Sequence, residues 1–336
     1  MSRPWHVADA AAVAVALTLG AVLTTSTAAQ QPALKAGTEL KVVVTIRPIH
    51  SIAAAVLDGI AEPRLLVAGT ASPHTFTLKP SDVKALGAAD ELFRVSETLE
   101  PFTVKLAQAL PKRVRLVTLE AAAGLTLLPL RTGATFEAHD HGPAKGGHGH
   151  GHAHGHKSGP SHAGTDGHLW LDPANAKVLA AHIASELALI APEHADRLKT
   201  NAAAFAVRLD ALSAEIETTL QPLAGRSYVV FHDAYQYFER RFGLTPAGSV
   251  TISPDVAPSA KRVSELRRKI VTLKAACIFA EPQFEPRLIA PIIEGTAVRR
   301  GTLDPLGAAI PTGPGQYPAL MRALANDLKS CLANPA

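Results

Sequence analysis

The chain has 336 residues, of which 47% are hydrophobic and 5% aromatic, and its formal net charge is +4 at pH 7. This length is enough for two globular lobes, each with its own core. The charge is small for the length, and the basic residues are scattered apart from short clusters such as 267–269. The composition therefore argues against a nucleic-acid-binding protein.

The first 29 residues differ from the rest of the chain. Arg3 precedes an apolar run over residues 10–23, and small residues follow at 26–29. This order predicts a secretory signal peptide, residues 1–29, with cleavage near Ala29. A membrane anchor is the alternative, but the run is short for a bilayer and no Lys/Arg stop signal follows it. No cysteine near the cleavage region could carry a lipid, so we expect an exported, soluble protein without a lipid anchor.

Residues 38–172 predict a first lobe. Short apolar runs predict strands at residues 40–46, 63–69, 91–96 and 113–119, with helices at 50–60, 81–89 and 100–110 between them. This alternation predicts an α/β lobe with a mostly parallel sheet. At its end, residues 129–167 are rich in Gly, His, Pro and Ser and have no apolar periodicity, which predicts a low-complexity, histidine-rich loop.

Residues 173–224 predict a helical segment. One helix begins at Pro173 and ends near Ile190, and Pro192 occupies a favoured first-turn position of a second helix. Apolar residues recur along the second helix at three- and four-residue steps: Leu198, Ala202, Phe205, Leu209, Leu212, Ile216 and Leu220. A helix of about thirty residues is roughly 45 Å long. We therefore expect it to act as a brace between two lobes.

Residues 225–336 predict a second lobe that repeats the order of the first. The strands are expected at 227–232, 244–250, 276–281 and 299–304, and the helices near 234–242, 258–273, 286–296 and 317–332. This lobe also contains the two cysteines of the chain, Cys277 and Cys331. In an exported protein they favour one disulfide between a strand and the C-terminal end, with two buried free thiols as the alternative.

Four chemically suitable side chains fall at or near the ends of predicted strands: His74, His168, His232 and Asp304. Ligands of open α/β sheets bind beyond the carboxyl ends of the strands, so these four can converge between the lobes. Three imidazoles and one carboxylate suit Zn²⁺ better than Mn²⁺ or Ca²⁺. Singly, each histidine has an alternative as a hydrogen-bonded rim residue, and Asp304 before Pro305 has one as a turn nucleus.

Other polar residues receive structural predictions. His50, His182 and His194 lie on helical patterns without matching partners, and Asp172 before Pro173 is expected to cap the following helix.

The segments "ASPHTFTLKPSD", "HLWLDP", "FHDAYQYF" and "LDPLG", in this order and spacing, resemble the zinc-binding periplasmic solute-binding proteins of ABC importers. These form part of the metal-specific family called cluster A-I or cluster 9. The resemblance covers nearly the whole mature chain. It implies two pseudo-symmetric α/β lobes joined by a long rigid helix, and high-affinity Zn²⁺ capture between them. It also implies that the protein delivers the metal to an inner-membrane ABC zinc permease and is not an enzyme. We expect the protein to be a monomer.

The resemblance places the family's ligand positions on His74, His168, His232 and Asp304. Manganese and iron relatives have Glu at the position of His232, so this histidine favours zinc. Some zinc relatives use a Glu directly before the first histidine as the fourth ligand, whereas this chain has Pro73 there. The fourth ligand is then Asp304 or a water, and we expect Asp304.

Two further features fit the zinc members. They often carry a histidine-rich loop before the second ligand and a disulfide in the second lobe, which here implies a Cys277–Cys331 bond. The loop offers accessory metal ligands without fixed geometry: His139, His141, His148, His150, His152, His154, His156 and His162. Its alternating His and Gly residues predict several weak, exchangeable sites that capture or buffer zinc. A passive spacer is the alternative.

Two other classes of protein remain open at this point. A zinc-storage or chaperone protein without a permease would bind the metal in the same way. A zinc-dependent hydrolase would need an open coordination position and a general base. The sequence has no HExxH motif, and Asp233 and Glu239 are acidic groups near His232 with no assigned position.

Overall fold

A computed structural model describes residue 1 and residues 39–131, 164–251, 259–284 and 289–333. The described elements belong to one compact unit, Ala33–Ala336. The expected signal peptide and all eight histidines of the expected loop lie outside the described residues. Within the described part, no helix is both long and apolar enough to span a bilayer.

The first lobe is a four-stranded parallel sheet with the order β2-β1-β3-β4. Its elements are β1 (Val42–Val44), α1 (Arg47–Val56), β2 (Arg64–Leu65), α2 (Pro80–Ala88), β3 (Glu91–Arg94), α3 (Phe102–Ala109) and β4 (Arg115–Thr118). The central strands β1 and β3 are buried along their whole length. Helices cover both faces of such sheets, which explains the unbroken apolar run of β1.

The second lobe repeats this topology with the order β6-β5-β7-β8, again all parallel. Its elements are β5 (Tyr228–His232), α6 (Gln236–Phe242), β6 (Pro246–Thr251), α7 (Ala260–Thr272), β7 (Cys277–Ala280), α8 (Ala290–Ile293), β8 (Arg299–Thr302) and α9 (Gln316–Leu332). The predicted two-lobed α/β fold class is therefore confirmed. Helix α8 ends at Ile293 instead of the expected residue 296, because Gly295, which follows the C-cap Glu294, takes a left-handed φ of 70°.

Two long helices connect the lobes along the chain, α4 (Pro173–Ile190) and α5 (Ala195–Leu220). Asp172 caps α4 as predicted, because its Oδ1 accepts a hydrogen bond of 2.8 Å from the backbone N–H of Ala174. The buried residues of α5 are the seven of the predicted apolar stripe. At 26 residues the helix is about 39 Å long. It falls short of the expected thirty residues because 3-10 turns at Pro192–His194 and Gln221–Leu223 take up its ends.

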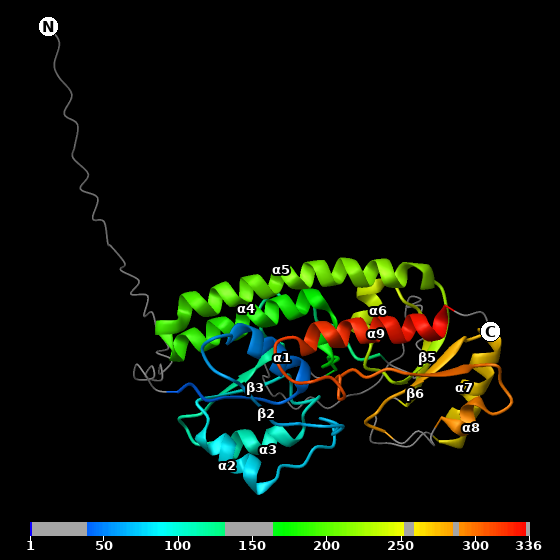
Figure 1. Ribbon diagram of the computed structural model, residues 1–336, viewed down its shortest axis with the longest axis horizontal. Coiled ribbons are helices and arrows are strands. Elements are labelled where there is room, and N and C mark those ends of the chain that lie inside the picture. Colours follow the sequence, from blue (N-terminus) through cyan, green and yellow to red (C-terminus); the bar gives the residue numbers. More distant parts are fainter. Residues whose placement is uncertain (2–38, 132–163, 252–258, 285–288, 334–336) are drawn as a thin grey trace. The chain divides into compact units, whose positions relative to one another are not determined.

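Helix α9 returns from the second lobe to the first. It lies alongside α5 and contacts α1, as Figure 1 shows. Its Tyr317 backbone N–H donates to Ser51 Oγ of α1 at 2.9 Å. Near its other end, Cys331 forms a disulfide with Cys277 of β7, with a Cα–Cα distance of 6.2 Å. The expected disulfide is therefore present, and one continuous apolar core runs from the first sheet through α4, α5 and α9 to the second sheet.

Candidate metal centre

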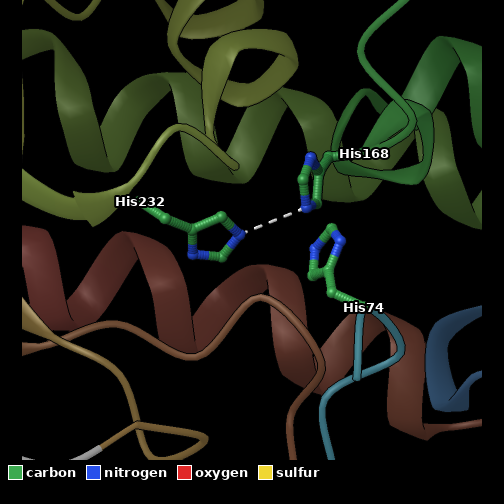
Figure 2. A group of neighbouring side chains, drawn as sticks. All are labelled: His74, His168 and His232. Carbon is green, nitrogen blue, oxygen red and sulfur yellow. Dashed lines mark hydrogen bonds between the residues drawn. The ribbon is translucent and has the colours of Figure 1, made fainter. Parts of the chain in front are cut away.

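Three histidines from separate segments point toward one another (Figure 2). His74 lies in the loop between β2 and α2, His168 directly precedes the 3-10 turn Leu169–Leu171, and His232 is the last residue of β5. One ring nitrogen of each lies within 4.8 Å of the others, and the Nε2 atoms of His168 and His232 are 3.3 Å apart. Among the described residues this group can hold a metal ion.

Carboxylates fix two of the three imidazoles. Asp166 Oδ1 lies 2.7 Å from Nδ1 of His168, and Glu281 Oε1 lies 2.8 Å from Nδ1 of His232. A carboxylate accepts a hydrogen bond from a protonated ring nitrogen, so each carboxylate favours the tautomer with its proton on Nδ1 and the lone pair of Nε2 directed at the centre. Both carboxylates are buried, Asp166 to 1% exposure and Glu281 to 2%.

Burial and nearby charges shift the pKa values of His74 and His232 in opposite directions. Burial lowers the pKa of His74 to about 2, and His168 and His232 add to this effect by like-charge repulsion. Burial also lowers the pKa of His232, but the carboxylates of Glu281, Asp233 and Asp166 together outweigh it, and the net shift is upward. His74 is therefore a neutral nitrogen donor at any physiological pH. At the ring of His232, a proton and a metal ion compete for binding.

Apolar side chains enclose the three imidazoles. The Trp170 ring lies 5.3 Å from that of His168, and the Phe284 ring lies 5.7 Å from that of His232. The free space beside the imidazoles is about 10 Å³. This is room for one water molecule or one metal ion, and far less than an organic substrate needs.

The structure does not bring Asp304 into this group. Its Oδ1 accepts hydrogen bonds from Gln283 Nε2 at 2.8 Å and Leu306 N at 3.0 Å, and its Oδ2 accepts one from Ala308 N at 2.6 Å. The carboxylate therefore stabilises the turn that follows β8, which was its alternative role. Asp304 as the fourth ligand stays a prediction.

Asp166 and Glu281 are the site residues that sequence reasoning missed. Glu281 directly follows β7, so the strand-end position that selected His232 also applied to Glu281. Asp166 lies two residues before His168, and its spacing alone gave no signal. Of the histidines expected to be structural, His50 contacts the carbonyl oxygen of Pro63 through Nε2 at 2.8 Å.

The fold has two parallel-sheet lobes, and the group of three histidines between them can hold a metal ion. This is the architecture of a two-lobed solute-binding protein. The sequence model of the family described as zinc-uptake complex component A, periplasmic (ZnuA), matches residues 42–331. The chain belongs to this family.

Individual relatives agree with the family match. The high-affinity zinc uptake system protein ZnuA of Brucella suis biovar 1 (strain 1330) is 46% identical over 311 residues, covering 89% of this chain and 93% of that protein. The protein of the same name from Yersinia pestis is 39% identical over 295 residues, covering 87% and 91%. A mutant structure of the laminin-binding adhesin Lmb from Streptococcus agalactiae aligns with a TM-score of 0.69 at 27% identity, covering 87% and 99%.

Proposed function

We propose that this protein captures Zn²⁺ with His74, His168 and His232 and delivers it to an inner-membrane ABC permease. Members of its family are the metal carriers of zinc-uptake systems and are not enzymes. The observation that carries the proposal is the group of three imidazoles within 4.8 Å of one another. Their nitrogen donors suit tetrahedral Zn²⁺, with the fourth position left to Asp304 or a water.

The surroundings of the group support a carrier over a hydrolase. The free space of about 10 Å³ holds an ion without room for an ester or a peptide. Asp233 and Glu239, the two acidic residues considered as bases for a hydrolase, are paired with Arg131 at 3.1 and 2.6 Å. A storage protein without a permease has no observation in its favour.

The remaining parts of the proposal concern the organisation and location of the chain. Residues 1–29 act as a signal peptide that directs a monomer to the periplasm without a lipid anchor. The first lobe spans 38–172 with the loop at 129–167, the helical segment spans 173–224, and the second lobe spans 225–336. The periplasmic component A of a zinc-uptake complex has an ABC permease as its partner, and we assign nucleic acid no part in its function.

Metal analysis and anomalous diffraction on untagged protein test the capture site, since they give the identity, number and ligands of the metal together. Zinc bound by residues other than the three histidines would reject the assignment. Delivery is tested separately by uptake of radioactive zinc into vesicles that contain the permease. Zinc binding without stimulated uptake would favour the storage alternative.

The histidine-rich loop is proposed as an accessory element that captures zinc for the tight site. Deletion of residues 142–161 is expected to remove weak binding beyond one equivalent and to leave one tight site. Isothermal titration calorimetry measures both. Loss of the tight site in this deletion would contradict the proposed division of labour.

A further inference from the structure

The residues at the two ends of the histidine-rich loop, 128–131 and 164–166, form a short antiparallel stem. This stem ends beside the metal centre. Pro129 and Thr165 pair across the stem. The backbone N–H of Leu130 donates to the carbonyl of Gly164 at 2.5 Å, and that of Asp166 donates to the carbonyl of Leu128 at 2.8 Å. Asp166 is thus both the last residue of the stem and the hydrogen-bond partner of His168.

Helix α6, which follows His232, holds the stem by polar contacts. Tyr237 Oη accepts a hydrogen bond from the Leu128 N–H at 3.0 Å and donates one to the Asp166 carbonyl at 2.9 Å. The amide of Gln236, oriented so that both its polar atoms are satisfied, donates to Asp166 Oδ2 at 3.2 Å and to the Pro129 carbonyl at 3.1 Å. The second oxygen of the Asp166 carboxylate is therefore also anchored by α6.

Arg131 adds an ionic link between the stem and the segment around His232. Its Nη1 lies 3.1 Å from Oδ1 of Asp233, the residue after His232, and its Nη2 lies 2.6 Å from Oε2 of Glu239. Glu239 is 2% exposed and also accepts a hydrogen bond from Tyr228 Oη at 3.3 Å. Removing one partner of a buried ion pair leaves an uncompensated charge, so this link is costly to break.

The geometry points to Arg131 as a positioning residue of the metal centre. Arg131 fastens the stem to Asp233 and Glu239. Because Asp166 of the stem holds His168, this link sets the distance between His168 and His232. The inference rests on the proposed function, because it gives Arg131 a part in zinc capture without contact to the metal. It also means that the two segments flanking the histidine-rich tract are linked to His168 through Asp166 and to the residue after His232 through Arg131.

Three variants of the full chain test this role. Arg131→Gln removes the charge and the two-pronged contact, whereas Arg131→Lys keeps the charge. Arg322→Gln is the matched control, because Arg322 pairs with Glu215 between α9 and α5 with both side chains about half exposed. Zinc affinity is measured by competition with a chromophoric chelator, ligand geometry by the absorption spectrum of the Co²⁺-loaded protein, and folding by thermal unfolding without metal.

Arg131→Gln is expected to weaken zinc binding about tenfold, as for other residues that orient metal ligands, and to change the cobalt spectrum. Arg131→Lys is expected to recover most of the affinity, and Arg322→Gln to match the wild type in both. Wild-type affinity and spectrum in Arg131→Gln would overturn the inference. Weaker binding with an unchanged spectrum would overturn it too, because it would reduce Arg131 to a charge-balancing residue.

A second variant keeps the test valid if Arg131→Gln does not fold. Asp233→Asn preserves the side-chain shape and removes one ion pair, and its zinc affinity and cobalt spectrum are expected to change in the same direction. Wild-type values in that variant would also overturn the inference. A wild-type chain that binds no zinc would instead reject the proposed function, so the two failures are distinguishable.

Discussion

The two sides of the metal centre are held by different means. His168 and His232 each direct Nδ1 at a buried carboxylate, and the stem and α6 join their surroundings. His74 instead lies in a loop of the first lobe, where its backbone N–H donates to Ser72 Oγ at 3.3 Å. Among the described residues, no side chain forms a hydrogen bond with its ring. Two ligand candidates thus have a fixed tautomer and orientation, while the third is positioned by its loop and by packing alone.

This difference suggests a division of work within one site. A ligand fixed by a carboxylate loses little rotational freedom when it binds a metal, so less of its binding energy is spent on ordering. A ligand without such a partner can adjust to the ion after the other two have engaged it. The comparison predicts distinct responses to substitutions on the two sides.

The largest expected effect comes from removing a ligand on either side. His232→Ala and His74→Ala should each weaken zinc binding by more than the roughly 10- to 100-fold that residues outside the coordination shell contribute. Chelator competition measures the affinity, and His182→Ala, on the partly exposed side of α4, serves as the control. Tight binding in either variant would remove that histidine from the ligand set.

Removing a carboxylate partner should have an intermediate effect. Glu281→Ala is expected to weaken zinc binding about 10- to 100-fold, and Glu281→Gln less, because glutamine still accepts the hydrogen bond from Nδ1 but lacks the charge. Ser72→Ala, which affects only a backbone contact of His74, should cost less than either. A larger loss in Ser72→Ala than in Glu281→Ala would contradict the proposed difference between the two sides.

The smallest expected effect is a shift in pH dependence. The pKa of His232 is raised, so protons compete with zinc and affinity should fall as the pH drops through that raised value. In the metal-free protein the sign is opposite: protonated His232 stabilises the fold fully below its unfolded pKa of about 6.5, and this contribution is lost as the pH rises through the folded pKa. Glu281→Gln should move the fall in zinc affinity to lower pH. Affinity titrations from pH 5 to 8 measure the shift, and an unchanged midpoint would contradict the role given to Glu281.

Periodicity predicted most of the fold because it reports burial directly. The seven apolar residues of the α5 stripe are the buried ones, and the strand and helix order of both lobes follows the predicted alternation. Element ends were less accurate. The 3-10 turns beside α5 and the left-handed Gly295 after α8 depend on local backbone geometry that apolar spacing does not encode.

The strand-end rule selected His74, His168 and His232, which the fold brings together, but it did not identify the side chains that contact them. It places a residue's backbone near the cleft without determining where the side chain turns. Asp304 meets the rule, and its carboxylate accepts hydrogen bonds from the backbone N–H groups of Leu306 and Ala308. These two residues follow Asp304 closely in the sequence, whereas the three histidines are distant in the sequence. Glu281 also meets it and contacts a ligand candidate through a long-range pairing of β5 with β7. Such contacts depend on the assembled sheet.

The pairing of Pro129 with Thr165 has a consequence for how this protein can change in evolution. The two strands of the stem hold their own register through backbone hydrogen bonds, independently of the number of residues between them. The free energy of closing a loop grows slowly with its length, by about 0.6 kcal/mol for each doubling. A change in the number of residues between the two segments therefore adds little to the free energy of closing the stem. The contact of Asp166 with His168 lies outside this tract, so it does not depend on the tract's length.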